Sequence, residues 1–201
     1  MKIINVVQGS EEWLSARCGI PTASNFDKLV TTKGEPSKQW RKYLLQLAGE
    51  SVAGKQEETY KNAAMIRGNE MEAEARSFYE LTTGKTVELV GFCESEGKAR
   101  YGASPDGFVG DDGIIEIKCP MMATHVSYLV DGGLDMEYFQ QVQGELLVTG
   151  RKWCDIISYY PAIRPLVVRV EPIKDFQDKL SEHLVTFCNQ LTDLIKQIKG
   201  E

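Results

Sequence analysis

Residues 101–120 read YGASPDGFVGDDGIIEIKCP, and this stretch decides the fold. Its second half, Ile114–Lys118, has the β-branched composition of a buried strand, yet it carries a carboxylate at Glu116 and an ammonium at Lys118. The segment Asp111-Asp112-Gly113 suits a three-residue loop, with two residues in a type I turn and then Gly in the left-handed conformation. We therefore predict a β-hairpin over residues 107–119.

The register of this hairpin decides which side chains share a face. With the loop at that position, Asp106 falls opposite Lys118. Opposed residues point to the same face of an antiparallel pair, as do residues two apart on one strand. The register therefore gathers Asp106, Glu116 and Lys118 on one face, and it leaves Ile115 and Ile117 on the other.

These three side chains have the chemistry of a hydrolytic metal site. Two carboxylates on one edge can share a divalent ion, and the Ile117 carbonyl lies beside them as a further oxygen ligand. A neighbouring lysine can orient or deprotonate a water and offset the charge of a phosphorane-like transition state. The alternative is an ordinary solvent face of an edge strand, with Asp106 capping a turn after Pro105. The motif alone leaves both interpretations open.

The composition is typical of one globular domain over residues 1–201, with 42% apolar residues and a net charge of −6. No run of eighteen apolar residues and no signal peptide stands out, and the five scattered cysteines fit reduced thiols, so we expect a cytoplasmic protein with no membrane contact. Only His125 and His183 are present, which favours oxygen ligands and hence Mg²⁺ or Mn²⁺. The net charge argues against nonspecific coating of nucleic acid, but it allows a local basic groove.

Hydrophobic periodicity predicts an α/β domain with a mixed sheet. We expect helices at residues 10–17, 22–30, 40–53, 62–81, 124–130 and 136–148, and a long amphipathic helix from about 176 to 198. We expect strands at residues 3–7, 86–93, 99–102, 107–110, 114–119, 153–160 and 166–171. The polar segment 31–42 between two helices is the most basic part of the chain.

Two of the expected helices carry further candidate side chains. Glu72 lies beside a buried stripe, where it either faces the carboxylate cluster or pairs with Arg76 one turn on. Tyr138 and Gln141 lie one turn apart on a common face, for which the alternative is an ordinary polar face.

Five motifs occur in a fixed order along the chain: W13 with RCGIPTAS at 17–24, RG at 67–68 with E72 and AR at 75–76, PD at 105–106, EIKCP at 116–120, and QVQ at 141–143. This pattern resembles the phage-type alkaline exonuclease family, whose best-known member is the exonuclease of bacteriophage lambda. That family belongs to the PD-(D/E)xK nuclease superfamily. The similarity spans residues 10–150 and is weaker over 31–61 and the C-terminal helix. It implies a restriction-endonuclease-like core, a central mixed β-sheet flanked by helices.

The resemblance also implies roles for the clustered residues. Asp106, Glu116 and the Ile117 carbonyl would hold Mg²⁺, with a second ion once DNA is bound and with Mn²⁺ as a substitute. Glu72 would complete the metal shell. Lys118 would position and activate the attacking water, with help from Gln141.

A second group resembles the family's pocket for a 5′-terminal phosphate, namely Arg17, Thr22 and Ser24. A Thr/Ser-rich helix N-terminus and a nearby guanidinium are suited to an anion, although a simple helix cap is the alternative. Ser104 and Tyr138 match lesser DNA-contacting positions. Trp13 would either stack on the DNA end or lie in the core.

The family reaction is 5′→3′ digestion of one strand of linear duplex DNA to 5′-mononucleotides, which leaves a 3′ single strand for recombination by annealing. The resemblance further implies a homotrimer ring around double-stranded DNA, a single-strand annealing protein as partner, and a phage or prophage protein in a bacterial host. Two other readings stay open: an endonuclease on the same core, and a non-catalytic DNA-binding module on a degenerate nuclease fold.

Overall fold

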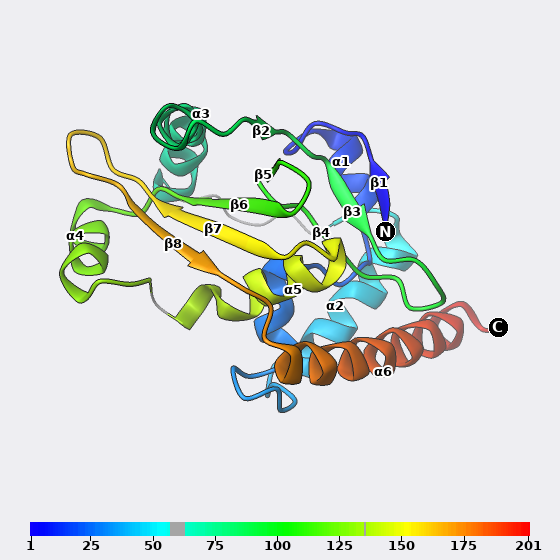
Figure 1. Cartoon of the computed structure of the whole chain (residues 1–201). Helices are drawn as coiled ribbons and strands as arrows, with labels where there is room; N and C mark the ends of the chain where they lie inside the picture. Colours follow the sequence, from blue (N-terminus) through cyan, green and yellow to red (C-terminus); the bar gives the residue numbers. More distant parts are fainter. Residues whose placement is uncertain (57–62, 135) are drawn as a thin grey trace.

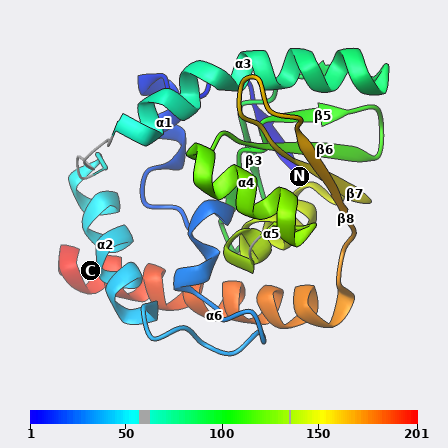
Figure 2. The same ribbon diagram turned by 90° about the vertical axis from the view of Figure 1, so that its left-hand side faces the viewer.

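The computed structural model describes residues 1–56, 63–134 and 136–201. Among them, a five-stranded sheet in the order β2-β5-β6-β7-β8 has α3 on one face and α5, α2 and α6 on the other (Figure 1). The turned view shows the same layers, with α3 along the top and α6 along the bottom (Figure 2). A smaller sheet, β1-β3-β4, lies beside the main one.

The helices are α1 Glu11–Arg17, α2 Trp40–Ala53, α3 Ala63–Thr83, α4 Met122–Asp131, α5 Phe139–Thr149 and α6 Lys174–Lys199, with 3₁₀ turns η1 Ala23–Lys28 and η2 Met136–Tyr138. The strands are β1 Lys2–Ile4, β2 Val87–Glu88, β3 Phe92–Glu94, β4 Gly102–Ala103, β5 Gly107–Val109, β6 Gly113–Lys118, β7 Trp153–Ser158 and β8 Leu166–Val170. Strands β6 and β7 run parallel and the other pairs are antiparallel, so the prediction of an α/β fold with a mixed sheet is confirmed.

Strand β6 separates two cores. Ile114 packs in the larger core, under α5 and α6, while Ile115 and Ile117 pack in the smaller core, under α3. Because side chains alternate along a strand, Glu116 and Lys118 lie on the same face as Ile114. The predicted separation of the charged face from Ile115 and Ile117 is therefore confirmed.

The predicted register is wrong by two residues. The loop is Gly110-Asp111-Asp112, Val109 pairs with Gly113, and it is Gly110 that has a positive φ, of 56°. Gly113 instead starts β6 against Trp153, where an added Cβ would lie 2.1 Å from the indole ring. Extending this register places Asp106 opposite Glu116 rather than Lys118. The face is unchanged, because the side-chain period of a strand is two.

Several other boundaries differ from the prediction. The strand expected over 86–93 is two short strands in different sheets, and a Cβ at the intervening Gly91 would lie 2.4 Å from the Ile4 carbonyl oxygen. The helix expected at 22–30 is the short 3₁₀ turn η1. The first strand covers only Lys2–Ile4. Residue 62, where we expected a helix to begin, lies outside the described residues. Residues 57–61, at the end of the segment where the resemblance is weaker, also lie outside them.

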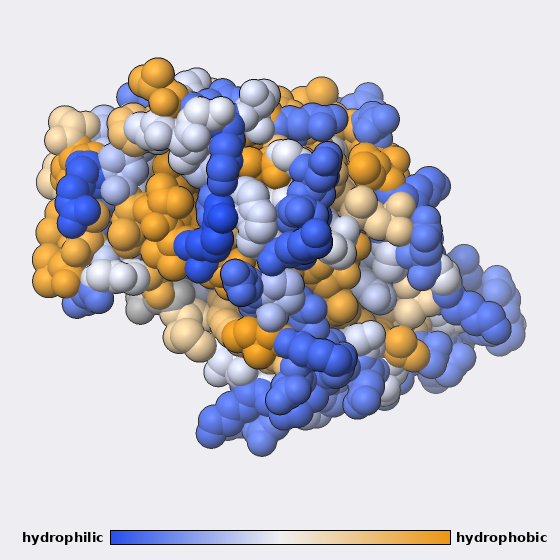
Figure 3. Space-filling model, viewed as in Figure 1, coloured by the Kyte–Doolittle hydropathy of each residue, from blue (hydrophilic) through white to orange (hydrophobic). Residues whose placement is uncertain are grey.

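Exposed apolar side chains are concentrated on α4. Met122, Val126 and Val130 follow one another at four-residue spacing and are 51%, 40% and 78% exposed. Figure 3 shows hydrophobic residues at the left, where Figure 1 draws α4, and hydrophilic ones over α6. Within the described ranges, no helix has the length and apolar character needed to cross a bilayer.

Buried Asp155 on β7 ties the sheet to its neighbours. Its carboxylate accepts hydrogen bonds from the Arg169 guanidinium at 2.7 Å and from the Tyr79 hydroxyl at 2.7 Å. Burial alone would raise the pKa of Asp155, but the hydrogen bonds from Arg169 and Tyr79 outweigh it and lower the pKa below its ordinary value.

We expect Asp155→Ala to reduce the free energy of unfolding by about 2–3 kcal/mol, because Tyr79 and Arg169 lose their acceptor. The loss is not larger because Arg169 is partly exposed and water can solvate its guanidinium. The contribution of ionised Asp155 is present above the unfolded-state pKa of about 3.9 and is lost as the pH falls through the lower folded-state pKa. Urea unfolding at pH 7 and pH 3 measures both. Asp178→Ala, which removes an exposed partner of Lys174, serves as control and should leave the midpoint nearly unchanged. Equal midpoints for the two variants would contradict this role.

Candidate active site

The predicted carboxylates and lysine lie together at the C-terminal end of β6. Asp106 immediately precedes β5, and its Oδ2 accepts a hydrogen bond from the Ile117 backbone N–H at 2.5 Å. The Lys118 ammonium donates to Glu116 Oε1 at 2.7 Å. Glu116 is only 3% exposed, which places a charge in a site from which water is largely excluded. The structure thus brings all four of these residues into one cluster.

Gln141 of α5 completes the cluster. Its Nε2 donates to Glu116 Oε1 at 2.5 Å, and its Oε1 accepts from the Lys118 ammonium at 3.2 Å. Tyr138, one turn earlier, places its ring centroid 4.6 Å from the same ammonium. The common face expected for Tyr138 and Gln141 is therefore directed at Lys118, and the reading of an ordinary polar face is excluded.

The electrostatics of the cluster follow from burial and crowding. Burial raises the pKa of Asp106 well above its ordinary value, and the neighbouring Glu116 and Glu72 raise it further. For Lys118, burial alone would lower the pKa, but Glu116 and Asp106 outweigh it and raise the pKa above its ordinary range. The carboxylates crowd around a single ammonium, and a divalent cation bound among them would relieve their mutual repulsion.

The donor set fits a hard divalent cation. Glu116 Oε2 is buried and has no hydrogen-bond partner among the described residues. The N–H and carbonyl of one strand residue point to the same side, so the Ile117 carbonyl lies on the edge that faces Asp106. Within residues 1–56, 63–134 and 136–201, no three His, Cys, Asp or Glu side chains form a complete site by themselves. Mg²⁺ does not need one, because it retains waters and also binds substrate phosphates.

Glu72 of α3 forms the helix pair with Arg76 and also lies near the carboxylate cluster, so both interpretations of this residue agree with the structure. Its Oε1 pairs with Arg76 at 3.3 Å, one turn along the helix. It also lies near enough to Asp106 to raise that residue's pKa. In this structure Glu72 thus borders the cluster without contacting it directly.

Glu145, one turn after Gln141 on α5, is a member of the cluster that the sequence analysis missed. It is 1% exposed, its Oε1 accepts from Gln141 Nε2 at 2.9 Å, and its Oε2 has no partner within the described chain. Gln141 Nε2 is thereby held between Glu116 and Glu145, which turns its Oε1 toward Lys118. The available signal was a glutamate four residues after Gln141, directly before the apolar run Leu146-Leu147-Val148.

We expect Glu145→Leu to lower kcat about tenfold with a smaller change in KM, because the Gln141 amide loses the acceptor that fixes its orientation. Glu145→Gln keeps an acceptor at this position and is expected to stay within about threefold of the wild type. Steady-state hydrolysis of linear DNA by both variants provides the measurement. Equal losses in the two variants would show that Glu145 acts through its charge rather than by orienting Gln141.

A second cluster forms around Arg17 at the end of α1. Arg17 Nη2 donates to Thr22 Oγ1 and to Ser24 Oγ, each at 3.3 Å, so the three residues expected to bind a terminal phosphate lie side by side. We call this group the Arg17 pocket. Arg17 Nε is buried without a partner in the described part of the chain. Burial lowers the pKa of Arg17 to about 10. A guanidinium whose Nη2 lies between two hydroxyls, and whose Nε has no partner among the described residues, is suited to bind an oxyanion.

The alternative of a simple helix cap does not hold for Thr22. The helix expected at 22–30 is the 3₁₀ turn η1, and the Thr22 side chain makes no capping hydrogen bond to it. The Thr22 hydroxyl instead accepts from Arg17.

Trp13 and Ser104 belong to the same cluster. The Trp13 ring lies 3.8 Å from the Arg17 guanidinium carbon, one turn away on α1, and its Nε1 donates to Ser104 Oγ at 3.0 Å. Thr22 forms a β-bridge with Gly102, two residues before Ser104. Since Asp106 follows Ser104 by two residues, one short segment joins the Arg17 pocket to the carboxylate cluster.

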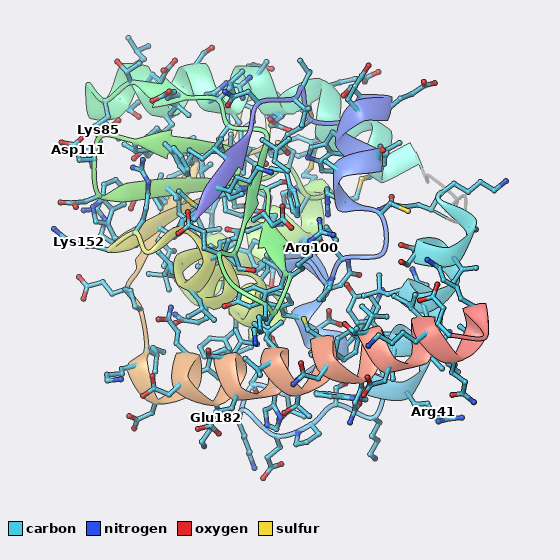
Figure 4. The ribbon with its side chains drawn as sticks, turned by 90° about the vertical axis from the view of Figure 1, so that its right-hand side faces the viewer. Arg41, Lys85, Arg100, Asp111, Lys152 and Glu182 are labelled. Atoms are coloured by element: carbon cyan, nitrogen blue, oxygen red, sulfur yellow. The ribbon has the colours of Figure 1, made fainter. Side chains whose placement is uncertain are left out.

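A hollow of about 450 Å³ lies elsewhere, at the outer end of the β5–β6 hairpin. It is lined by Lys85, Asp111 and Trp153, among others. Figure 4 shows Lys85, Asp111 and Lys152 near one another at this end of the sheet. None of the predicted site residues lines this hollow, so it is separate from both clusters.

The fold, with carboxylates and a lysine at the end of β6, is the one found in a solved alkaline exonuclease. The chain belongs to the YqaJ-like viral recombinase domain family, which it matches over residues 12–152. The resemblance found in the sequence, and the restriction-endonuclease-like core that it implies, are thereby confirmed.

Solved structures agree with this assignment. The chain is 36% identical to an alkaline exonuclease (LHK-Exo) from Laribacter hongkongensis, with a TM-score of 0.86 over 94% of this chain and 96% of that one. The structure of LHK-Exo in complex with dAMP gives 35% identity and a TM-score of 0.84 over the same shares. A phage-related exonuclease from Haemophilus somnus, at 16% identity, shares the fold, with a TM-score of 0.68 over 89% of this chain and 96% of that one. No curated protein sequence matches the chain.

Proposed function

We propose that the protein is a Mg²⁺-dependent 5′→3′ exonuclease that degrades one strand of linear duplex DNA to 5′-mononucleotides and leaves a 3′ single strand for recombination by annealing. The observation that carries this proposal is the adjacency of the two clusters through Gly102 and Ser104. A pocket for a terminal phosphate next to a hydrolytic site is needed by an enzyme that starts at ends. The alkaline exonuclease activity of LHK-Exo and its dAMP complex support the proposal.

Asp106, Glu116 and the Ile117 carbonyl would hold the ion, with Glu72 at the border of the shell and a second ion added with DNA. When bound, Mg²⁺, or Mn²⁺ in its place, would stabilise the charge that develops on the attacking and leaving oxygens. The oxygen donors of this chain suit either metal.

The remaining residues act on the water and on the DNA. Lys118 donates a hydrogen bond to the attacking water and offsets charge on the phosphoryl oxygens. Gln141, fixed by Glu116 and Glu145, offers its amide to the same water. Tyr138 and Ser104 would contact the DNA strand beside the reacting phosphate. The Trp13 ring lies against the Arg17 guanidinium and would stack on the DNA end beside it.

Arg17→Ala is expected to slow digestion of 5′-phosphorylated ends about 10- to 100-fold, because a charged bidentate donor is lost. On 5′-hydroxyl ends the effect should be less than about threefold. Arg17→Lys keeps the charge but not the fork and should lie between the two. The comparison uses initial rates on otherwise identical duplexes. Equal losses on both kinds of end would refute the phosphate pocket.

The experiment that tests the whole proposal is digestion of linear duplex DNA phosphorylated at the 5′ end of one strand, in Mg²⁺ and in EDTA, beside covalently closed circular DNA. Loss of the phosphorylated strand in Mg²⁺ alone, with the circle intact, is the expected result. Cutting of the circle would favour the endonuclease, and absence of hydrolysis with any metal would favour the non-catalytic binding module.

We also propose a homotrimer ring around the DNA and a functional partnership with a single-strand annealing protein. A ring would retain the DNA topologically despite the net charge of −6. Sedimentation of the purified protein tests the ring, because a trimer and a monomer differ threefold in mass.

A further inference from the structure

A small polar hollow lies between η1 and α2, next to the Arg17 pocket. It has a volume of about 90 Å³ and is lined by Lys28, Gln39, Lys42, Tyr43 and Gln46. Two ammonium groups, two amides and a phenol thus surround the hollow, and no carboxylate lines it. The Gln46 amide donates to the Glu50 carboxylate at 2.8 Å, and Glu50 does not line the hollow.

The two lysines are not neutralised by ion pairs. In the described part of the chain, neither Lys28 nor Lys42 lies within 4.0 Å of a carboxylate. The Lys28 ammonium donates to Asn25 Oδ1 at 2.6 Å and lies 5.3 Å from the Tyr43 ring centroid. These contacts hold the ammonium at the rim of the hollow and leave its charge for an anion.

Contacts connect this hollow to the Arg17 pocket. Asn25, which accepts from Lys28, donates through Nδ2 to Thr22 Oγ1 at 3.3 Å and to Ser24 Oγ at 3.4 Å. The Tyr43 hydroxyl, on the wall of the hollow, accepts from the Thr22 N–H at 3.3 Å. The path of contacts therefore runs from Asp106 through the Arg17 pocket and then to Lys28.

We propose that Lys28 and Lys42 form a second phosphate subsite, which binds a backbone phosphate of the DNA strand that is not digested. The inference rests on the proposed function. The 5′-terminal phosphate is the last phosphate of the digested strand, so a phosphate site beyond its pocket serves the complementary strand. Ammonium and amide donors are the groups that proteins use to hold phosphates without reading sequence.

The test is a binding measurement in EDTA, so that hydrolysis plays no part. The DNA is a 5′-phosphorylated duplex with a fluorescent label at its far end, either blunt or with a 3′ single-stranded overhang on the complementary strand. Lys28→Gln combined with Lys42→Gln keeps the aliphatic stems and removes both charges. Arg41→Gln removes a charge from the same helix at a residue that does not line the hollow, and which Figure 4 shows at the outer edge of the molecule. Thermal melts check that both variants are folded.

We expect the double variant to bind the overhang DNA about tenfold more weakly and to reduce the slope of log K against log salt by about 0.7. The affinity of the double variant for the blunt duplex should differ from that of the wild type by less than about twofold. The affinity of Arg41→Gln for either DNA should also differ by less than about twofold. Unchanged affinity and slope on overhang DNA would overturn the subsite, and equal loss on both DNAs would assign the lysines to the duplex instead. Failure of the proposed function would be seen separately, in the digestion of linear and circular DNA by the wild-type protein.

Discussion

Lys118→Ala is expected to lower the rate of phosphodiester hydrolysis about 10³-fold at saturating Mg²⁺, with DNA affinity in EDTA changed by less than about threefold. The ammonium lies at the centre of the cluster, 2.7 Å from Glu116 and 3.2 Å from Gln141, and it is the cation there that can meet a developing negative charge. Removal of the ammonium therefore destabilises the transition state much more than it weakens DNA binding. Single-turnover hydrolysis separates the two effects, because it reports the chemical step alone.

The control for Lys118→Ala is Lys152→Ala. Lys152 pairs with Asp112 at 2.9 Å on the outer end of the hairpin, far along β6 from Lys118, and it is 72% exposed. The Lys152→Ala variant should hydrolyse DNA at the same rate as the wild type. If Lys118→Ala instead weakens metal binding and hydrolyses at a near-normal rate once loaded, its role in positioning the water is wrong.

Asp106→Asn is expected to abolish hydrolysis, with a loss of at least about 10³-fold that added Mg²⁺ does not restore. The same change should raise the thermal midpoint in EDTA. Burial and the neighbouring Glu116 raise the pKa of Asp106, which means that its ionised form is unfavourable in the folded, metal-free protein. A neutral amide removes this cost while it keeps an acceptor for the Ile117 N–H.

Hydrolysis, calorimetric Mn²⁺ titration and thermal melts in EDTA together test this assignment. Asp112→Asn removes a carboxylate from the same hairpin, one that is 51% exposed and paired with Lys152, and should leave all three readouts unchanged. A folded Asp106→Asn protein that binds Mn²⁺ and hydrolyses DNA as the wild type does would remove Asp106 from the metal site.

The charged face of β6 could be predicted from sequence because it depends only on alternation along a strand. The register could not be predicted, because the sequence offers two glycines, Gly110 and Gly113, for the left-handed position of the loop. The packing of Trp153 against Gly113 decides that Gly110 takes this position. That error left the prediction of the face intact because it amounts to one full side-chain period.

The features that sequence reasoning missed depend on contacts between distant segments. Gly91 lies between β2 and β3, and its backbone passes close to Ile4, which allows β3 to join the smaller sheet. Glu145 was not singled out in the sequence, and only the fold places it beside Glu116 and Lys118. In contrast, the stacking of Trp13 on Arg17 follows their four-residue spacing on α1 and was available from the sequence.

The segment from Gly102 to Asp106 has a consequence for what the enzyme releases. Gly102 is fixed to Thr22 in the Arg17 pocket, and Asp106 is fixed to Ile117 in the carboxylate cluster. Four residues of chain span at most about 14 Å. In the proposed reaction this stretch limits the distance between the bound 5′ end and the bond that is cut, and thus limits the size of each product released.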